Sequence, residues 1–204
     1  MLRPKRFKIG RRLGPAVFDQ TQTDRFAMSE ARKKNAAKKD KHKKNISAFN
    51  LALREKQRVR LYYGMTERQF AAYVKHATEL KGNPVSHLYT RLESRLDNIA
   101  YRAGLAPTHR AARQMVAHGH LLVNGKRIRV PSHQVSVEDV VGIRGGSSGK
   151  PLFMLGAEKL KEHQSPAWIA FDEKKGGWRV GGQPNLDEAT SAFNFRSVIE
   201  YYSR

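Results

Sequence analysis

The chain contains no cysteine among its 204 residues. Disulfide bonds, thiolate metal sites and cysteine nucleophiles are therefore excluded, and the composition suits a reducing compartment. Long apolar runs are missing too: none approaches the roughly 20 residues that a membrane-spanning helix needs. The basic residues among positions 1–13 accompany no apolar core, so we expect no secretory signal peptide.

Acidic side chains are scarce, with 18 Asp and Glu against 39 Lys and Arg, a net charge of +21 and a pI of about 10.5. Such a field attracts polyanions, either a nucleic acid or an anionic membrane surface. A membrane is the weaker alternative because no aromatic-rich amphipathic anchor stands out. The composition therefore indicates a nucleic-acid partner.

The positive charge is unevenly distributed. Residues 1–44 carry a net charge of +11, residues 45–90 +4, residues 91–155 +6 and residues 156–204 zero. We therefore expect the polyanion along the first three quarters, and a packing or partner surface in the last. The lysine-rich run 31–44 has no apolar residue larger than alanine, which predicts an extended arm, residues 1–44, that becomes ordered on RNA.

Helical periodicity begins at Ser47 and predicts a helix that ends at Gly64. Thr66 and Gln69 form a capping box, which starts a second helix. Its buried stripe is Phe70, Val74 and Ala77. Residues 45–90 thus predict the first part of a helical domain.

A third helix is expected over residues 86–103, with Leu88, Leu92, Leu96, Ile99 and Ala103 as its apolar stripe. At about 100° per residue, Arg91, Arg95 and Arg102 fall within about 40° of one another. A fourth helix begins with Thr108 as its N-cap and ends at His118 and Gly119. Its inward residues are Ala112, Met115 and Val116, and its outward residues are Arg110, Arg113 and Gln114.

Asn124 and Gly125 supply the positive φ angles of a type I′ hairpin turn. Short strands are expected to follow, through Val130, Val135, Val137, Val140, Val141 and Ile143. The fold class is therefore α+β: a basic arm, a helical domain, and a module of two helices plus a small antiparallel sheet.

Residues 145–150 read GGSSGK, but their spacing does not match a phosphate-binding loop, because Arg144 replaces its first glycine. Beyond them we expect a helix over residues 151–163, a hairpin with strands at 168–171 and 178–180, and a short final helix within 193–202.

Several segments of the sequence resemble a known protein family. RLDNIAYRAG, THRAARQMVAHGH and VNGKRI, together with LREKQRVRLYYGMTERQF, FKIGRRLG and the closing IEYYSR, are similar to the bacterial-type ribosomal protein S4 family, in its cysteine-free form. The resemblance covers nearly the whole chain. It implies an S4 RNA-binding domain over residues 91–155, inserted in the helical domain, and a C-terminal segment, residues 156–204, that packs back on the helical domain.

The resemblance also implies a non-enzymatic constituent of the small ribosomal subunit. Such a protein binds the 5′ domain of 16S-type rRNA early in assembly, contacts protein S5 and other small-subunit proteins, and influences translational accuracy near the mRNA entry region. The expected location is on a cytoplasmic ribosome, with an organelle ribosome left open. No cofactor, small-molecule substrate or membrane is implied, and the absence of cysteine rules out the metal knot of some relatives.

Structured RNA is recognised by shape, phosphates and exposed bases, for which arginine is well suited. The predicted contacts on the arm are Lys5, Arg6, Lys8, Arg11 and Arg12; those on the helical domain are Arg54, Lys56, Arg58 and Arg60. Those on the S4 domain are Arg91, Arg95, Thr108, His109, Arg110, Arg113, Gln114, His118, Asn124, Lys126 and Arg127. His118, His120, His109 and His133 are interpreted as RNA contacts or turn packing, not as a zinc site.

Two other functions remain open. An RNA-modifying enzyme with an S4 module, such as a pseudouridine synthase, would need a separate catalytic domain, for which the residues outside the module are too few. A free-standing RNA chaperone or translational repressor would share every surface feature.

Overall fold

The computed structural model describes residues 5–36, 47–149, 163–184 and 192–203. Two compact units emerge, one formed by Met1–Val85 with Asp187–Arg204 and the other by Ser86–Leu186. Among the described residues, none of the helices has the length and apolar character needed to cross a membrane.

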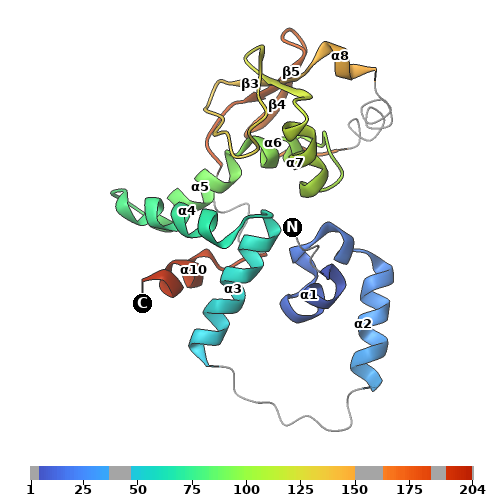
Figure 1. Cartoon of the computed structure of the whole chain (residues 1–204), viewed down its shortest axis with the longest axis vertical. Coiled ribbons are helices and arrows are strands. Elements are labelled where there is room, and N and C mark those ends of the chain that lie inside the picture. Colours follow the sequence, from blue (N-terminus) through green and yellow to red (C-terminus); the bar gives the residue numbers. More distant parts are fainter. Residues whose placement is uncertain (1–4, 37–46, 150–162, 185–191, 204) are drawn as a thin grey trace. The chain divides into compact units, whose positions relative to one another are not determined.

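The first unit is helical (Figure 1). Its elements are α1 (Arg6–Leu13), η1 (Pro15–Val17), η2 (Asp19–Thr21), α2 (Asp24–Ala36), α3 (Ala48–Tyr62), α4 (Glu67–Glu79) and α10 (Phe195–Tyr202). The C-terminal α10 packs against α3 and α4. The predicted stripe of Phe70, Val74 and Ala77 is buried, with exposures of 1% or less.

The local start and stop signals of α3 and α4 behave as predicted. Ser47 caps α3, Gly64 follows it with a φ of 60°, and the capping box of Thr66 and Gln69 opens α4. Each signal acts within one turn of the chain, so a sequence pattern is enough to locate it.

The expected extended arm is wrong for residues 5–36, which fold into α1, η1, η2 and α2. Leu13, Val17 and Phe26 are buried, and Gly10 lies so close to Thr21 that a β-carbon there would stand 2.7 Å from its Cγ2. Apolar residues spaced among the basic ones thus supply a small core. The rest of the lysine-rich run, residues 37–44, lies outside the described residues.

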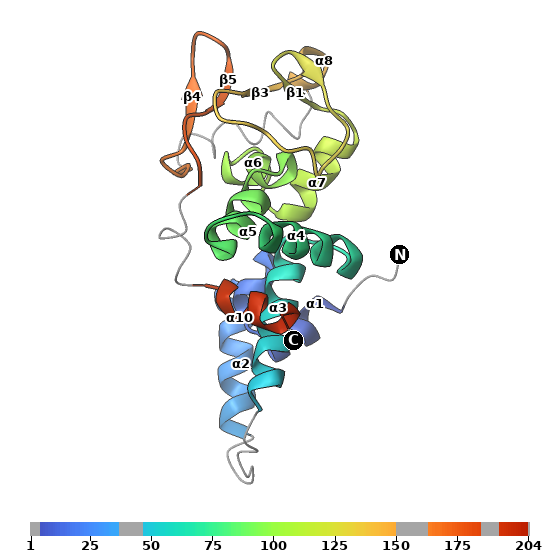
Figure 2. The same cartoon turned by 90° about the vertical axis from the view of Figure 1, so that its left-hand side faces the viewer.

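The second unit packs helices on one side of a sheet (Figure 2). Its elements are α5 (Pro84–Glu93, whose first two residues belong to the first unit), α6 (Leu96–Arg102), α7 (His109–Ala117), β1 (Leu121–Val123), β2 (Lys126–Arg127), β3 (Val140–Ile143), α8 (Gly145–Ser148), β4 (Ile169–Asp172) and β5 (Gly177–Val180). The described strands form an antiparallel sheet in the order β2-β1-β3-β5-β4. The α+β class is confirmed.

The C-terminal quarter divides between the units, which corrects the expectation that all of residues 156–204 pack on the helical domain. The hairpin β4–β5 extends the sheet of the second unit, with Val141 opposite Trp178, whereas α10 packs on α3 and α4. Buried Trp168, Ile169 and Trp178 explain the difference, because they belong to the core of the second unit. The helix expected over 151–163 falls almost wholly in the undescribed residues 150–162.

The single helix expected over 86–103 is instead two helices, α5 and α6. The chain leaves the helix at Ser94, whose carbonyl accepts from Val135, and the Leu96 amide donates to His133. Arg95 forms an isolated bridge with Gln134. The segment before β3 therefore pairs with the break between the helices, and of the strands predicted from Val130 to Ile143 only β3 forms.

Candidate nucleic-acid interface

Helix α7 presents a polar face to solvent because its apolar residues are fixed inward. The Thr108 hydroxyl accepts from the Ala111 amide at 3.1 Å, which caps the helix. The inward residues Ala112, Met115 and Val116 are buried as predicted. Arg110 and Gln114 are exposed and Arg113 is half-buried, so these side chains lie on the predicted outward face.

The hairpin after α7 is a type I′ turn, with φ angles of 49° at Asn124 and 78° at Gly125. The Asn124 amide nitrogen donates to Asp139 Oδ1 at 2.7 Å, and its oxygen accepts from the Val140 amide at 2.9 Å. These bonds tie the turn to the strand that follows, so the Asn124 side chain serves the fold. Lys126 stands exposed beside it.

Arg127 joins the hairpin to the end of α7. Its Nε donates to the Gly119 carbonyl at 2.9 Å and its Nη2 to the His118 carbonyl at 3.0 Å. Desolvation lowers the pKa of Arg127, and the nearby charges of Arg129 and Arg144 lower it further. The helix face and the hairpin therefore form one basic surface.

Arg129 and Arg144 were missing from the predicted contact set, yet both are exposed and act on Arg127. Arg144 comes to this corner because β3 pairs with β1, with Leu121 opposite Ile143. A signal was available in the sequence: pairing the apolar run 121–123 with 140–143 would have put Arg144 next to the end of α7.

The predicted arginine face over residues 91–102 does not form. Arg95 is 1% exposed and makes hydrogen bonds of 2.9 and 2.6 Å to the carboxylate of Asp97. Arg102 pairs at 2.8 Å with Glu93, which is fully buried. The break between α5 and α6 turns these side chains into the protein, so Arg95 is corrected from an RNA contact to a core residue. Arg91 is half-buried.

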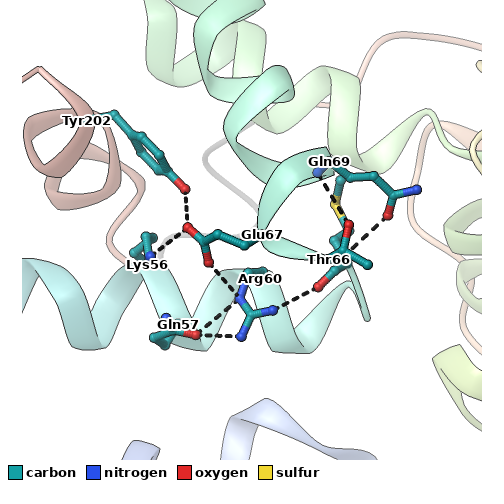
Figure 3. Close-up of polar contacts among 8 residues, drawn as sticks. Lys56, Gln57, Arg60, Thr66, Glu67, Gln69 and Tyr202 are labelled. Atoms are coloured by element: carbon teal, nitrogen blue, oxygen red, sulfur yellow. Dashed lines mark hydrogen bonds and ion pairs between the residues drawn. The ribbon is translucent and has the colours of Figure 1, made fainter. Parts of the chain in front are cut away.

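Lys56 is also corrected, because it is 5% exposed and belongs to a polar network inside the first unit. Its Nζ lies 2.6 Å from Glu67 Oε1, which also accepts from the Tyr202 hydroxyl at 2.8 Å. Arg60 Nε lies 3.2 Å from Glu67 Oε2 and donates to Gln57 at 3.1 Å (Figure 3). This network links α3, α4 and α10.

Burial alone would raise the pKa of Glu67, but hydrogen bonds from Lys56 and Tyr202, with the charges of Lys56 and Arg60, outweigh it and lower the pKa. Burial, followed by the bond to Glu67, raises the pKa of Tyr202. Both shifts favour the hydrogen bond from a neutral tyrosine to an ionised glutamate. Lys56 and Arg60 thus neutralise the Glu67 carboxylate.

The two other basic residues of α3 hold neighbouring segments. Arg54 donates to the Arg12 carbonyl at 2.9 Å, and Arg58 donates to the Ala192 carbonyl at 2.9 Å. Arg58 also pairs with Glu55 at 2.6 Å. Their charge contributes to the surface, but their side chains are half-buried and serve packing within the unit.

The arm contributes several of the exposed cations of the first unit. Lys5, Lys8 and Arg12 are exposed, and spacing by four places Lys8 and Arg12 on one face of α1. Arg6 donates to Gln20 at 2.7 Å and Arg11 pairs with Glu30 at 2.8 Å. Of the predicted arm contacts, Arg6 and Arg11 therefore bond within the arm.

His109 begins α7, and His118 and His120 follow the other end of that helix, each in distinct surroundings. The ring of His109 stacks on Tyr101 at 3.8 Å between centroids. His120 Nδ1 lies 3.0 Å from Ser147 Oγ, and the exposed His118 ring stands 5.9 Å from the His120 ring. Over the described ranges, no group of three or more His, Asp or Glu side chains is placed to hold a metal ion.

Comparison with known proteins agrees with this geometry. Residues 1–93 match the family described as ribosomal protein S4/S9 N-terminal domain, and residues 94–141 match the S4 domain. The small ribosomal subunit protein uS4 of Cutibacterium acnes is 42% identical over 158 residues, 78% of this chain and 79% of that protein. The uS4 of Acetivibrio thermocellus is 39% identical over 163 residues, 80% and 78% of the two chains.

Both relatives are named as ribosomal proteins, in agreement with the expectation of a non-enzymatic chain. The matched N-terminal domain and S4 domain adjoin at residues 93 and 94, next to the break between α5 and α6. The chain therefore belongs to the uS4 family of small ribosomal subunit proteins.

Proposed function

We propose that the chain is a structural constituent of the small ribosomal subunit that binds small-subunit rRNA directly. The observation that carries this proposal is the joining of two basic elements. Arg127 bonds the hairpin to the C-terminal end of α7, so the outward residues of α7 and the hairpin lysine form one rigid surface. Membership of the uS4 family supports the same partner.

The chemistry of this surface suits folded RNA. An A-form major groove is too narrow for side chains, so a protein reads phosphates, 2′-hydroxyls and unpaired bases. Arg110 and Lys126 are exposed without an ion pair among the described residues, and are therefore available to phosphate. Thr108 caps the start of α7, where backbone amides add partial positive charge.

The arm supplies separate RNA contacts within the proposal. Exposed Lys5, Lys8 and Arg12 would contact a further RNA segment. We place the primary site in the 5′ domain of 16S-type rRNA, bound early in assembly. Protein S5 is the proposed protein neighbour, with an effect on translational accuracy near the mRNA entry channel. The proposed location is the ribosome, in the cytoplasm or in an organelle.

A filter-binding titration on small-subunit rRNA tests the proposal. Arg110→Ala combined with Arg113→Ala should weaken binding at least about tenfold, since a charge-assisted hydrogen bond contributes of order 1.5–3 kcal/mol. The log–log slope of affinity against salt should flatten by roughly 1.4–1.8, because each neutralised phosphate contributes about 0.7–0.9 to it.

The control carries the same change of net charge. Lys75→Ala combined with Arg196→Ala removes two exposed cations that already pair with Glu79 and Glu200. It should leave affinity and slope nearly unchanged. If both double variants lose affinity equally, net charge alone accounts for binding. An unchanged salt slope for the α7 variant would refute the assignment.

A further inference from the structure

The sheet of the second unit has an outer face with basic residues on β2, just after β2 and just after β3. Leu121 and Val123 of β1 are buried in the core, so the intervening Leu122 faces outward. Leu122 stands opposite Arg127 on β2 and opposite Gly142 on β3. Alternation along a strand then assigns every second residue of β2 and β3 to this outer face.

This register gathers three arginines on the outer face. Ile128 and Ile143 pack against the core, so their neighbours Arg129 and Arg144 turn outward, on the same side as Arg127. The Arg144 amide donates to the His120 carbonyl at 2.8 Å. The Ile128 amide donates to the Leu121 carbonyl at 3.3 Å, which puts Arg129 on the other side of His120.

The three guanidinium groups have no carboxylate among them in the part of the chain that is described. Arg129 and Arg144 form no ion pair there, and Arg127 donates to the carbonyl oxygens of His118 and Gly119. Arg129 and Arg144 also help to lower the pKa of Arg127, as expected for neighbouring like charges. A bound anion would relieve this repulsion.

Gly119 determines where Arg127 lies. It has a φ of +69°, and a β-carbon there would overlap Arg127 Nε and stand 2.8 Å from its Nη2. These atoms are the far end of a flexible side chain, so an alanine at position 119 would displace the Arg127 guanidinium and leave the backbone in place. The missing side chain of Gly119 thus provides the space in which Arg127 is held.

We propose that Arg127, Arg129 and Arg144 form a phosphate-binding face for the backbone of an RNA strand that crosses β2, β1 and β3, with Gly119 as its positioning residue. The inference rests on the proposed rRNA function and adds contacts on the sheet to those on α7. The planar guanidinium of an arginine can donate two hydrogen bonds at once to the oxygens of a phosphodiester. A fixed Arg127 flanked by two exposed arginines matches the repeating charge of an RNA backbone.

The test uses the full-length chain and filter binding to small-subunit rRNA over a range of salt. Arg129→Gln combined with Arg144→Gln should weaken binding about tenfold and flatten the salt slope by roughly 0.7–0.9 for each phosphate that is no longer neutralised. Gly119→Ala, which removes no charge, should weaken binding and flatten the slope in the same direction.

Gly176→Ala is the matched control for Gly119→Ala. Gly176 has a φ of +58°, with nothing within 4 Å of an added β-carbon, so it carries the same backbone strain without touching an arginine. It should bind like the wild type. Tryptophan fluorescence, which reports the folding of the second unit, verifies that each variant is folded.

Wild-type binding separates the two claims. If the wild type fails to bind rRNA, the proposed function fails, and with it this inference. If the wild type binds but the arginine double variant keeps the wild-type affinity and slope, the phosphate-binding face alone is refuted. Equal effects of Gly119→Ala and Gly176→Ala would refute the positioning role of Gly119.

Discussion

The buried ion pair of Arg95 and Asp97 predicts a large loss of stability for Asp97→Ala. The side chains are 1% and 7% exposed and are joined by hydrogen bonds of 2.6 and 2.9 Å. Arg95 cannot reach solvent without loosening the start of α6, because its carbonyl accepts from Ile99 and the next amide, of Leu96, bonds to His133. An uncompensated buried charge costs about 3–5 kcal/mol, which is the expected fall in unfolding free energy.

Urea titration followed by tryptophan fluorescence measures this effect in the right unit. The only two tryptophans of the chain, Trp168 and Trp178, are both buried in the second unit. Arg179→Ala is the control: its pair with Glu138 is exposed, with side-chain exposures of 46% and 62%, so its removal should cost less than about 1 kcal/mol.

Replacing both buried partners, by Arg95→Met with Asp97→Leu, should cost less than Asp97→Ala alone, because no charge is left unpaired. A fall of under about 1 kcal/mol for Asp97→Ala would refute the reasoning, since it would mean that Arg95 reaches water. In that case Arg95 would return to the set of candidate RNA contacts.

Three other changes test helix ends and the polar network. Thr108→Ala should cost about 1 kcal/mol by urea titration, because it removes the N-cap of α7; no change would contradict the capping role. Tyr202→Phe should accelerate amide hydrogen exchange in α10, because it removes the bond to Glu67; unchanged exchange would contradict the link. Because the pKa of Glu67 is lowered in the folded protein, the stability that its ionised form contributes is complete above the ordinary glutamate pKa and is lost as the pH falls through the lowered pKa. Circular-dichroism melts of the wild type and of Glu67→Gln should therefore converge in acid. A constant difference between them would contradict that shift.

The features that the sequence predicted correctly are those fixed by a few neighbouring residues. Thr66 and Gln69 form their capping box, Thr108 caps α7, and Asn124 with Gly125 forms the type I′ turn. Each depends on hydrogen bonds or φ angles within one turn of chain, so residue type and spacing are sufficient evidence. The outward face of α7 was predicted for the same reason.

The errors arose where distant segments decide the structure. An uninterrupted apolar stripe predicted one helix through Arg95, but backbone bonds from Ser94 and Leu96 to a loop about 40 residues away interrupt it. Lys56 looked like a surface cation because its partners, Glu67 and Tyr202, are brought to it only by the packing of α4 and α10. Charge alone did not reveal which basic residues have internal partners.

Co-sedimentation of the full-length chain with small ribosomal subunits at high salt tests the central claim most directly. High salt screens nonspecific attraction of a chain with a net charge of +21, so only a formed interface should survive. We predict that the wild type sediments with the small subunit in a nearly equimolar amount. The Arg110→Ala, Arg113→Ala variant should be depleted from the sedimented subunits. A wild-type chain that stays in the supernatant would contradict the account.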